Sequence, residues 1–186
     1  METLVQECVK ALQENKTILY PTDTVWGLGC DATNTAAVSK IYTLKNRVAS
    51  KSLIILVDSI TMLQDYITDI PKVALDILEK ATKPTTIIYK NPKGLATNVV
   101  AEDNTVGIRI PNDVFCKKLI SEFGKPIVST SANISGAPTP QTFSEISPAI
   151  LHSVDYIVNL HHDKINDTSS TILRITDTDE IEVIRA

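Results

Sequence analysis

Residues 124–136 read GKPIVSTSANISG, a short apolar run that ends in a cluster of hydroxyls, one amide and a glycine. The preceding residues 113–123 have a helical pattern that Gly124 would end. Residues 127–129 are typical of a short buried strand. A helix that leads directly into a strand favours an α/β fold. Because buried hydroxyls need hydrogen-bond partners, the polar loop is better suited to binding an anion than to filling a core.

Helical and strand patterns also mix through the rest of the chain, without the strict alternation of a Rossmann fold. Apolar residues at helical spacing predict a first helix within residues 4–12. Candidate starts of later helices are Asn34 or Thr35, Ser59, Pro71, and a capping box formed by Thr142 and Glu145. Expected strands lie at residues 17–20, 53–57, 85–89, 106–110, 127–129, 156–160, 171–175 and 181–184. Residues 91–104 are polar and predict a mobile loop. We therefore expect an α/β fold in which residues 1–186 form one domain, a twisted mixed β-sheet with flanking helices.

Composition limits the classes of function. A chain of 186 residues with 43% hydrophobic residues is long enough and apolar enough for one globular core. A net charge of −4 argues against general electrostatic binding of nucleic acid, so an anion site must use a few local cations. Three widely spaced cysteines without a C-x-x-C pair predict neither a metal site nor a disulfide framework. With no signal-peptide pattern and no stretch long enough to span a membrane, we expect a cytoplasmic protein without membrane contact.

A second polar, glycine-containing segment occupies residues 21–29 and reads PTDTVWGLG. Residues 27–32 formally match the dinucleotide-binding pattern G-x-G-x-x-A. We consider that match accidental, because the next helix is expected to begin only after Asn34. Taken alone, the segment is also typical of a strand-to-loop turn in which Thr22 and Asp23 bond to their own backbone.

Cations occur in two informative places. Lys45, Arg47 and Lys51 follow the expected second helix, either as solvated charges that favour a helix C-terminus or as a phosphate clamp. Arg109 lies inside an apolar strand, and strand alternation puts it on the face opposite Ile108 and Ile110. Either that face is exposed, or Arg109 lines a cavity and pairs with a carboxylate.

Two polar stretches near the C-terminus are less specific. Residues 168–170 are hydroxyl residues that lead into a strand, a pattern that ordinary turns share. His161, His162 and Asp163 are adjacent and lack the spacing of metal ligands, so we expect a solvated loop.

Together and in this order, the segments resemble the YrdC-like family, the threonylcarbamoyl-AMP synthases. The resemblance covers nearly the whole chain, and each motif alone is modest. It rests on Pro21-Thr22-Asp23-Thr24 with Gly27-Leu28-Gly29, Lys45-x-Arg47, Thr105-Val106-Gly107-x-Arg109-x-Pro111, Ser131-Ala132-Asn133-x-Ser135-Gly136 and Ser170-Thr171. It implies the YrdC-like α/β fold.

The resemblance implies a nucleotidyltransferase that makes threonylcarbamoyl-adenylate from L-threonine, bicarbonate or CO2, and ATP, with release of pyrophosphate. Mg²⁺ is implied together with the ATP. The product would feed the threonylcarbamoyladenosine modification of tRNA at adenosine 37, next to the anticodon. Downstream tRNA threonylcarbamoyl-transfer proteins would use it, so tRNA itself would be contacted indirectly or weakly. Positioning and charge stabilisation would supply most of the rate.

The resemblance also implies roles for individual residues. Lys45 and Arg47 would be the catalytic cations that hold the nucleotide phosphates. The ATP-binding positions would be Lys45, Arg47, Lys51, Thr105, Ser129, Ser131, Asn133, Thr139 and, in a loose alignment, Arg185. The threonine-binding positions would be Thr24, Arg109 and Ser170, with Arg109 as the partner of the substrate carboxylate.

The chain departs from the family pattern at several positions. Trp26 replaces a usual tyrosine and would wall the amino-acid pocket, while Val48 replaces a common proline. Residues 82–86 keep only the second half of a Pro-Gly-Pro-x-Thr stretch, which leaves the role of Thr86 open. Leu56 corresponds to a histidine that lies near the substrate in relatives. The length matches the short, single-domain branch of the family.

Two other functions remain open at this point. One is a carbamoyl-transfer domain on the same fold, which uses carbamoyl phosphate. Such domains are parts of much longer chains with zinc-finger segments, and this chain has neither those cysteines nor that length. The other is an RNA-binding module with a basic concave surface formed by Lys45, Arg47, Lys51 and Arg109. The acidic total charge and an aromatic content of 5% count against the RNA-binding module, because stacking platforms would be scarce.

Overall fold

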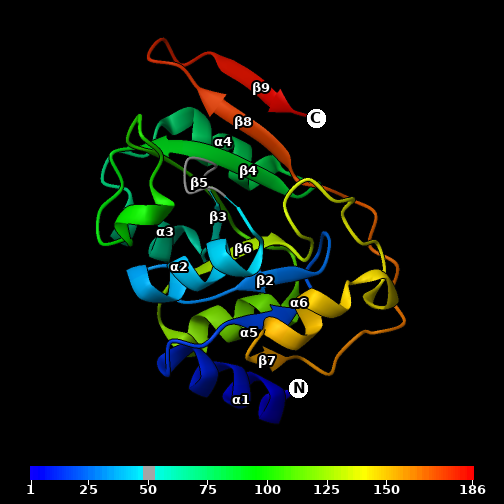
Figure 1. Cartoon of the computed structure of the whole chain (residues 1–186). Helices are drawn as coiled ribbons and strands as arrows, with labels where there is room; N and C mark the ends of the chain where they lie inside the picture. The colour runs from blue at the N-terminus through cyan, green and yellow to red at the C-terminus, as the bar shows by residue number, and fades with distance from the viewer. Residues whose placement is uncertain (48–52) are drawn as a thin grey trace.

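A curved mixed β-sheet organises the fold (Figure 1). The computed structural model describes residues 1–47 and 53–186. In these residues one nine-stranded sheet has the order β7-β1-β2-β6-β3-β5-β4-β8-β9. Its strands are β1 (Ile18–Tyr20), β2 (Gly27–Gly29), β3 (Ile54–Leu56), β4 (Thr85–Lys90), β5 (Thr105–Arg109), β6 (Ile127–Ser131), β7 (Tyr156–Ile157), β8 (Thr171–Ile175) and β9 (Ile181–Arg185). The pairs β1–β7, β3–β5 and β4–β8 are parallel and the other neighbours are antiparallel, which confirms the predicted α/β fold with a mixed sheet.

The helices begin and end largely where the capping residues predict. They are α1 (Glu2–Gln13), α2 (Thr35–Leu44), α3 (Ile60–Tyr66), α4 (Lys72–Lys80), α5 (Val114–Phe123) and α6 (Pro148–Ser153). The side chains of Asn34, Ser59 and Asp113 each accept a hydrogen bond from a backbone N–H in the first turn of the helix that follows. Gly124 ends α5 with a left-handed φ of 72°, a conformation that suits glycine.

The predicted capping box at Thr142 and Glu145 is wrong. Only a 3₁₀ turn, η2 (Phe143–Glu145), forms there, and the Glu145 carboxylate accepts from the backbone N–H of Gln141 at 2.8 Å. Helix α6 starts later and is capped by Ser147. The cause is Pro148, because a proline disfavours helical backbone at the residue before it and is well suited to the first helical position.

Two other expected segments differ from the structure. Residues 91–104 are packed rather than loose: they contain a 3₁₀ turn, η1 (Thr97–Val99), and Val99 is fully buried. The backbone N–H of Ala96 also donates to the carbonyl of Ala32 at 2.9 Å. The strand expected at residues 156–160 is only two residues long. The order of residues 91–104 comes from contacts with segments far apart in the sequence.

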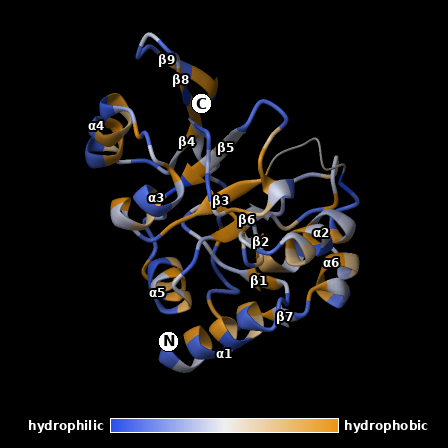
Figure 2. Ribbon diagram, turned by 90° about the vertical axis from the view of Figure 1, so that its left-hand side faces the viewer, coloured by the Kyte–Doolittle hydropathy of each residue, from blue (hydrophilic) through white to orange (hydrophobic). Residues whose placement is uncertain are grey.

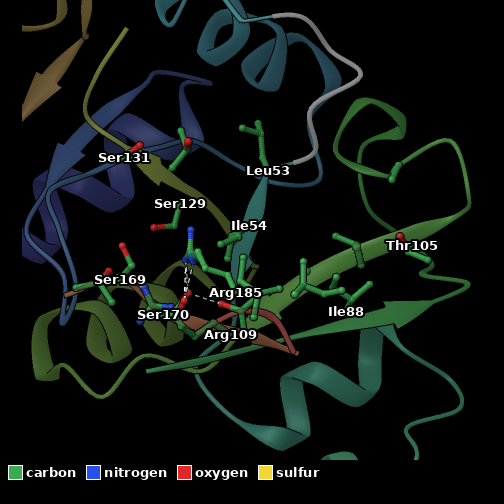
Figure 3. A pocket seen from close by; sticks show the side chains of 18 of the residues that line it. Leu53, Ile54, Ile88, Thr105, Arg109, Ser129, Ser131, Ser169, Ser170 and Arg185 are labelled. Atoms are coloured by element: carbon green, nitrogen blue, oxygen red, sulfur yellow. Dashed lines mark hydrogen bonds between the residues drawn. The ribbon is translucent and has the colours of Figure 1, made fainter. Parts of the chain in front are cut away.

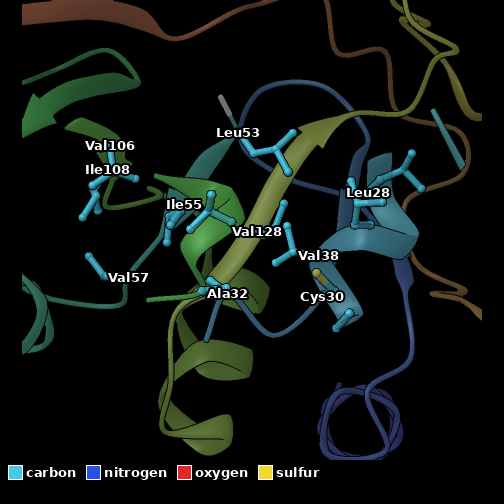
Figure 4. Close-up of a cluster of buried hydrophobic side chains, with 14 of the residues drawn as sticks. Leu28, Cys30, Ala32, Val38, Leu53, Ile55, Val57, Val106, Ile108 and Val128 are labelled. Carbon is cyan, nitrogen blue, oxygen red and sulfur yellow. The ribbon is translucent and has the colours of Figure 1, made fainter. Parts of the chain in front are cut away.

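The two faces of the sheet are covered unequally. On one face, apolar side chains of the strands pack under α2, α3, α4 and α6 in a large cluster that includes Val38, Ile55, Ile108 and Val128 (Figure 4). On the other face, α1 and α5 cover a second cluster that includes Leu56. Figure 2 shows α1 and α5 together below the central strands. The remainder of this second face carries polar strand residues and leaves room for a cavity.

No helix in the described part of the chain is long and apolar enough to cross a membrane.

Candidate active site

A cavity of about 640 Å³ lies over the part of the sheet that α1 and α5 do not cover (Figure 3). This volume is in the range of sites for small ligands. Its floor is built from β6, β3, β5, β4 and β8, and its walls include the turn before β2, the residue Arg47 after α2, and residues 101–103. Segments from both halves of the chain therefore meet at one site.

Strand register explains which side chains reach the cavity. Residues directly opposite each other on neighbouring strands point to the same face of a sheet. One cross-strand row consists of Leu56, Arg109, Thr86, Ile172 and Arg185. The next row on this face consists of Ser129, Ile54, Gly107, Ile88 and Arg174. Hydroxyl and guanidinium groups thus surround an apolar centre.

Most of the predicted site residues line this cavity. They are Thr24, Arg47, Thr105, Arg109, Ser129, Ser131, Thr139, Ser170 and Arg185. Lys45 is buried behind the cavity wall, and Asn133 lies in the loop that covers Lys45. Lys51 and Val48 lie outside the described residues.

Arg109 lies in the interior of the site. Its side chain is 3% exposed and forms an ion pair with Asp23, which also accepts from the backbone N–H of Asn112 at 2.8 Å. Its Nη2 lies 3.3 Å from Thr24 Oγ1, and its Nε has no hydrogen-bond partner among the described residues. Arg109 is therefore a cavity cation paired with a carboxylate, and the alternative of an exposed face is excluded.

The turn that contains Asp23 is fixed mainly by Thr22. Its Oγ1 accepts from the backbone N–H of Thr24 at 2.9 Å and donates to the carbonyl of Val25 at 2.8 Å. The expected bonding of a side chain to the local backbone is thus confirmed for Thr22. It is wrong for Asp23, whose carboxylate reaches Arg109 and Asn112.

Arg185, Ser170 and Thr86 form a network beside Arg109, whose cross-strand neighbour is Thr86. Arg185 donates to the carbonyl of Ser170 from Nε at 3.0 Å and from Nη2 at 2.8 Å, and Nη2 also lies 3.1 Å from Ser170 Oγ. Ser170 Oγ and Thr86 Oγ1 share a hydrogen bond of 2.8 Å. Burial and, secondly, the nearby Arg109 lower the pKa of the Arg185 guanidinium. Two cations held close together favour an anion between them.

Lys45 is 1% exposed and lies under the loop that follows β6. Its Nζ donates to the carbonyls of Ser131 and Asn133, the latter at 2.7 Å, and lies 3.3 Å from Asn133 Oδ1. Burial and, to a smaller extent, Arg47 lower the pKa of Lys45 to about 7. Arg47, two residues further on, reaches the cavity itself.

The charges around the cavity favour an anionic ligand. Four arginines line it, namely Arg47, Arg109, Arg174 and Arg185. In the described part of the chain, the carboxylates that line it are Glu102 and Asp103, both exposed at its edge, while Asp23 is the ion-pair partner of Arg109. Among the described residues, no group of three or more His, Cys, Asp or Glu side chains is arranged to hold a metal ion.

Several contributors were not identified from the sequence. Arg174 lines the cavity, and its position inside the strand Thr171–Ile175 is the same signal that pointed to Arg109. Gly107 lies in the floor, where an added Cβ would be 3.2 Å from Thr86 Cγ2. Thr86 is the hydrogen-bond partner of Ser170, and Asp23 is the ion-pair partner of Arg109. Neither pairing has a local signal in the sequence.

The structure also places three other side chains that the sequence pointed out. Trp26 is fully buried and does not wall the cavity; its ring lies 5.0 Å from Phe143 and 5.4 Å from His162. His161 and Asp163 are exposed in a loop, as expected, whereas the ring of His162 stacks on Phe143 with centroids 3.8 Å apart. Leu56, which stands where relatives have a histidine, belongs to the apolar cluster under α1 and α5.

Comparisons with known proteins show which family this chain belongs to. The family model of the Sua5, YciO and YrdC proteins, which has the description "Telomere recombination", matches residues 10–186. The threonylcarbamoyl-AMP synthase of Pseudoalteromonas translucida is 32% identical over 162 residues, which cover 85% of this chain and 86% of that protein. The threonylcarbamoyl-AMP synthase of Photobacterium profundum is 35% identical over 145 residues, which cover 76% and 78% of the two chains.

A solved structure shows the same fold. The structure of P. abyssi Sua5 complexed with L-threonine matches with a TM-score of 0.89 and 26% identity, over 97% of this chain and 53% of that one. The present chain thus spans about half the length of that Sua5 protein. Because the family model spans nearly the whole sequence and the relatives match along most of their own length, the chain belongs to the Sua5/YciO/YrdC family.

Proposed function

We propose that this protein is a threonylcarbamoyl-AMP synthase, which converts L-threonine, bicarbonate or CO2, and ATP to threonylcarbamoyl-adenylate and pyrophosphate. The observation that carries the proposal is the cavity in which four arginines and several hydroxyls from both halves of the chain converge. Two relatives that match most of the chain bear this enzyme name, and a Sua5 protein of the same fold was crystallised with L-threonine. Residues 1–186 form one domain in this proposal.

The site divides into two sides. We assign threonine to Thr24, Arg109 and Ser170, which line the cavity together. Arg109 is the partner for the carboxylate of threonine, because it is buried and its Nε has no hydrogen-bond partner among residues 1–47 and 53–186. We assign ATP to the remaining predicted residues: Arg47, Lys51, Thr105, Ser129, Ser131, Asn133, Thr139 and Arg185 would contact it, and Lys45 would act on it through the loop that it supports. Among them, Arg47 lines the cavity and Lys45 supports its wall from behind.

The reaction needs little covalent help from the protein. The unprotonated amine of threonine adds to CO2 and loses a proton, which gives a carbamate. A carbamate oxygen then attacks the α-phosphorus, the bond to the bridging oxygen breaks, and pyrophosphate leaves. Arg47 and Arg185 would stabilise the charge that develops on the phosphates, and Arg109 would hold the threonine carboxylate. Orientation of the two substrates is therefore the main contribution of this chain.

Mg²⁺ fits the site only as a partner of the nucleotide. Mg²⁺ in nucleotide enzymes is usually bound by one or two carboxylates together with substrate phosphates and water. Glu102 and Asp103 are the carboxylates at the edge of the cavity that would share such an ion. When bound, it would neutralise charge on the phosphates.

The product would pass to downstream tRNA threonylcarbamoyl-transfer proteins, and tRNA itself would be contacted indirectly or weakly. The proposed setting is the cytoplasm. An RNA-binding module is disfavoured by geometry, because the arginines line a cavity sized for a small ligand and Arg109 is almost fully buried. A long polyanion could not reach that guanidinium.

The test is a pyrophosphate-release assay with purified protein, ATP, bicarbonate and each amino acid in turn. We expect release that needs both L-threonine and bicarbonate. A parallel reaction with carbamoyl phosphate in place of bicarbonate and threonine examines the carbamoyl-transfer alternative, and we expect no turnover there. Pyrophosphate release that is independent of threonine, or the absence of any release, would contradict the proposal.

A further inference from the structure

We propose that Lys45 is a positioning residue: its ammonium group holds the loop of residues 131–135 from behind, in the shape that presents Ser131 to the nucleotide. Lys45 does not itself contact the phosphates. This inference rests on the proposed function, because it assigns a nucleotide to the cavity. The two cations of Lys45-x-Arg47 would then have different roles: Arg47, which lines the cavity, would contact the ligand, and Lys45 would support the loop.

All three donors of the Lys45 ammonium group are already used. They point to the carbonyls of Ser131 and Asn133 and to Oδ1 of Asn133. An ammonium group has three N–H donors and no acceptor. A phosphate oxygen could therefore bind Nζ only by displacing one of these oxygens, which would leave a polar group of the loop without its partner.

The loop is also fixed to the end of α2 by other bonds around Lys45. The backbone N–H of Ser135 donates to the carbonyl of Lys45 at 2.8 Å. Asn133 Nδ2 donates to the carbonyl of Ala137 at 2.7 Å. The loop thus wraps around Lys45, and the two carbonyls turned toward Nζ would lack a donor if the ammonium group were removed.

Lys45 is connected to the cavity through Asn133. Ser131 Oγ donates to Asn133 Oδ1 at 2.5 Å, and the same oxygen lies 3.3 Å from Lys45 Nζ. When a phosphate enters, the Ser131 hydroxyl can rotate and donate to it, because Lys45 still satisfies Asn133 Oδ1. Without Lys45, that rotation would leave the partly buried amide oxygen of Asn133 unpaired, at a cost that would weaken nucleotide binding.

The contribution of Lys45 should depend on pH. Burial and the charge of Arg47 bring its pKa to about 7, while its three oxygen acceptors act in the other direction and favour the ammonium form. A neutral amine has only two donors and turns a lone pair toward one of the oxygens. The support of the loop should therefore weaken as the pH rises above neutrality.

The test compares the wild type with Lys45→Met, which keeps a long side chain and removes the donors. Lys40→Met is the matched control, because Lys40 is an exposed lysine of α2, the helix that Lys45 follows, and its Nζ donates to the carbonyl of Asn15. Calorimetry gives the Kd of a non-hydrolysable ATP analogue and of L-threonine from pH 6 to 9. Hydrogen exchange of the Ser135 amide is followed in the protein without ligand.

We expect Lys45→Met to weaken binding of the ATP analogue at pH 6 by about tenfold or more, and to leave the Kd of threonine nearly unchanged. The difference from the wild type should shrink toward pH 9. The Ser135 amide should exchange faster in Lys45→Met, and Lys40→Met should match the wild type in every measurement. Unchanged exchange of Ser135 together with lost analogue binding would overturn the inference, because it would mean direct contact with the phosphates.

A second variant keeps the inference testable if Lys45→Met does not fold. Asn133→Ala removes the amide but leaves two carbonyl acceptors for Nζ, and we expect it to weaken analogue binding with faster exchange at Ser135. Normal exchange in Asn133→Ala would contradict the inference. If the wild type binds neither the ATP analogue nor threonine, the proposed function fails, whereas the exchange data still decide whether Lys45 supports the loop.

Discussion

Arg109 is the residue whose burial most restricts what the cavity can bind. Its guanidinium is already paired with Asp23, so an incoming carboxylate has to share it through the remaining N–H donors. We expect Arg109→Ala to raise the KM for threonine, because a charge-assisted bond worth about 1.5–3 kcal/mol is lost. Steady-state kinetics with threonine and ATP varied separately gives the two KM values.

Arg47→Ala is the comparison for that experiment. Arg47 lines the cavity on the nucleotide side, so its loss should raise the KM for ATP more than the KM for threonine. Equal effects of both variants on both KM values would contradict the division of the site. Urea unfolding of Arg109→Ala belongs to the experiment, because this variant leaves the Asp23 carboxylate without its partner.

Arg174 provides a contrasting cation. It lines the cavity, yet its ion pair with Glu182 is long, at 3.6 Å, and both side chains are about half exposed. Exposed pairs of this kind contribute about 0–1 kcal/mol to stability. We expect Arg174→Ala to unfold at nearly the same urea concentration as the wild type and to bind an ATP analogue more weakly. Lys118→Ala, on α5 and away from the cavity, is the control, and equal analogue affinity in the two variants would exclude a role for Arg174.

At the scale of elements, Gly29 in β2 shows how tightly the strands behind the cavity are packed. A Cβ at this position would lie 2.6 Å from the carbonyl oxygen of Val128 and 2.7 Å from Cε1 of Tyr20. Neither the β6 backbone nor the fully buried tyrosine ring can move freely. We expect Gly29→Ala to lower the free energy of unfolding by about 1–3 kcal/mol, measured by urea denaturation. Glu79→Ala, at an exposed position of α4, is the control, and equal midpoints would contradict this packing.

Local signals explain which elements could be predicted from the sequence. Asn34, Ser59, Asp113 and Gly124 act within one turn of their own helices, so their effect can be read from neighbouring residues. The prediction of a capping box at Thr142 was wrong because Pro148 starts the next helix. The proline is an equally local signal, and the prediction gave it too little weight. Residues 91–104 could not be placed, because their order depends on packing against distant segments.

The site needed more than local signals. Strand alternation placed Arg109 on the face opposite Ile108 and Ile110. Its partner Asp23 could not be predicted in this way, because it is 86 positions away in the sequence. Resemblance to a family brought together positions that line the cavity, whereas the burial of Lys45 could not be foreseen from its charge. A lysine next to a cavity is ordinarily expected to face the ligand. Here the carbonyls of a distant loop, 86 and 88 positions later, take up its donors.

At the scale of the whole molecule, sheet order brings the two ends of the chain to one site. Strand β6 lies between β2 and β3, and β4 lies between β5 and β8, so the turn at Thr24 and the residue Ser170 approach the same floor. Helices α1 and α5 cover only part of this face, and the uncovered remainder carries the hydroxyl and guanidinium groups. The cavity is therefore a consequence of how the sheet is covered, and Figure 3 shows its residues arriving from several strands.

Lys45 links the stability of the whole molecule to pH. Its pKa is about 7 in the folded protein and close to its usual 10.5 when unfolded, so the unfolded chain binds more protons between these values. The free energy of unfolding should therefore rise with pH across this window, by up to about 1.4 kcal/mol per pH unit from this group. Below about pH 7 the lysine is protonated in both states, and the cost of burying its charge is present in full.

The prediction is tested by urea unfolding of the wild type and Lys45→Met at intervals from pH 6.5 to 9.5. Groups that titrate in both proteins cancel in the difference, so the wild type should gain stability relative to Lys45→Met as the pH rises. Affinity for an ATP analogue should fall over the same range, because the neutral amine no longer supports the loop at Ser131. Stability and affinity should thus change in opposite directions, because both depend on the same proton of Lys45. A difference in stability between the two proteins that stays constant with pH would show that Lys45 keeps its charge throughout.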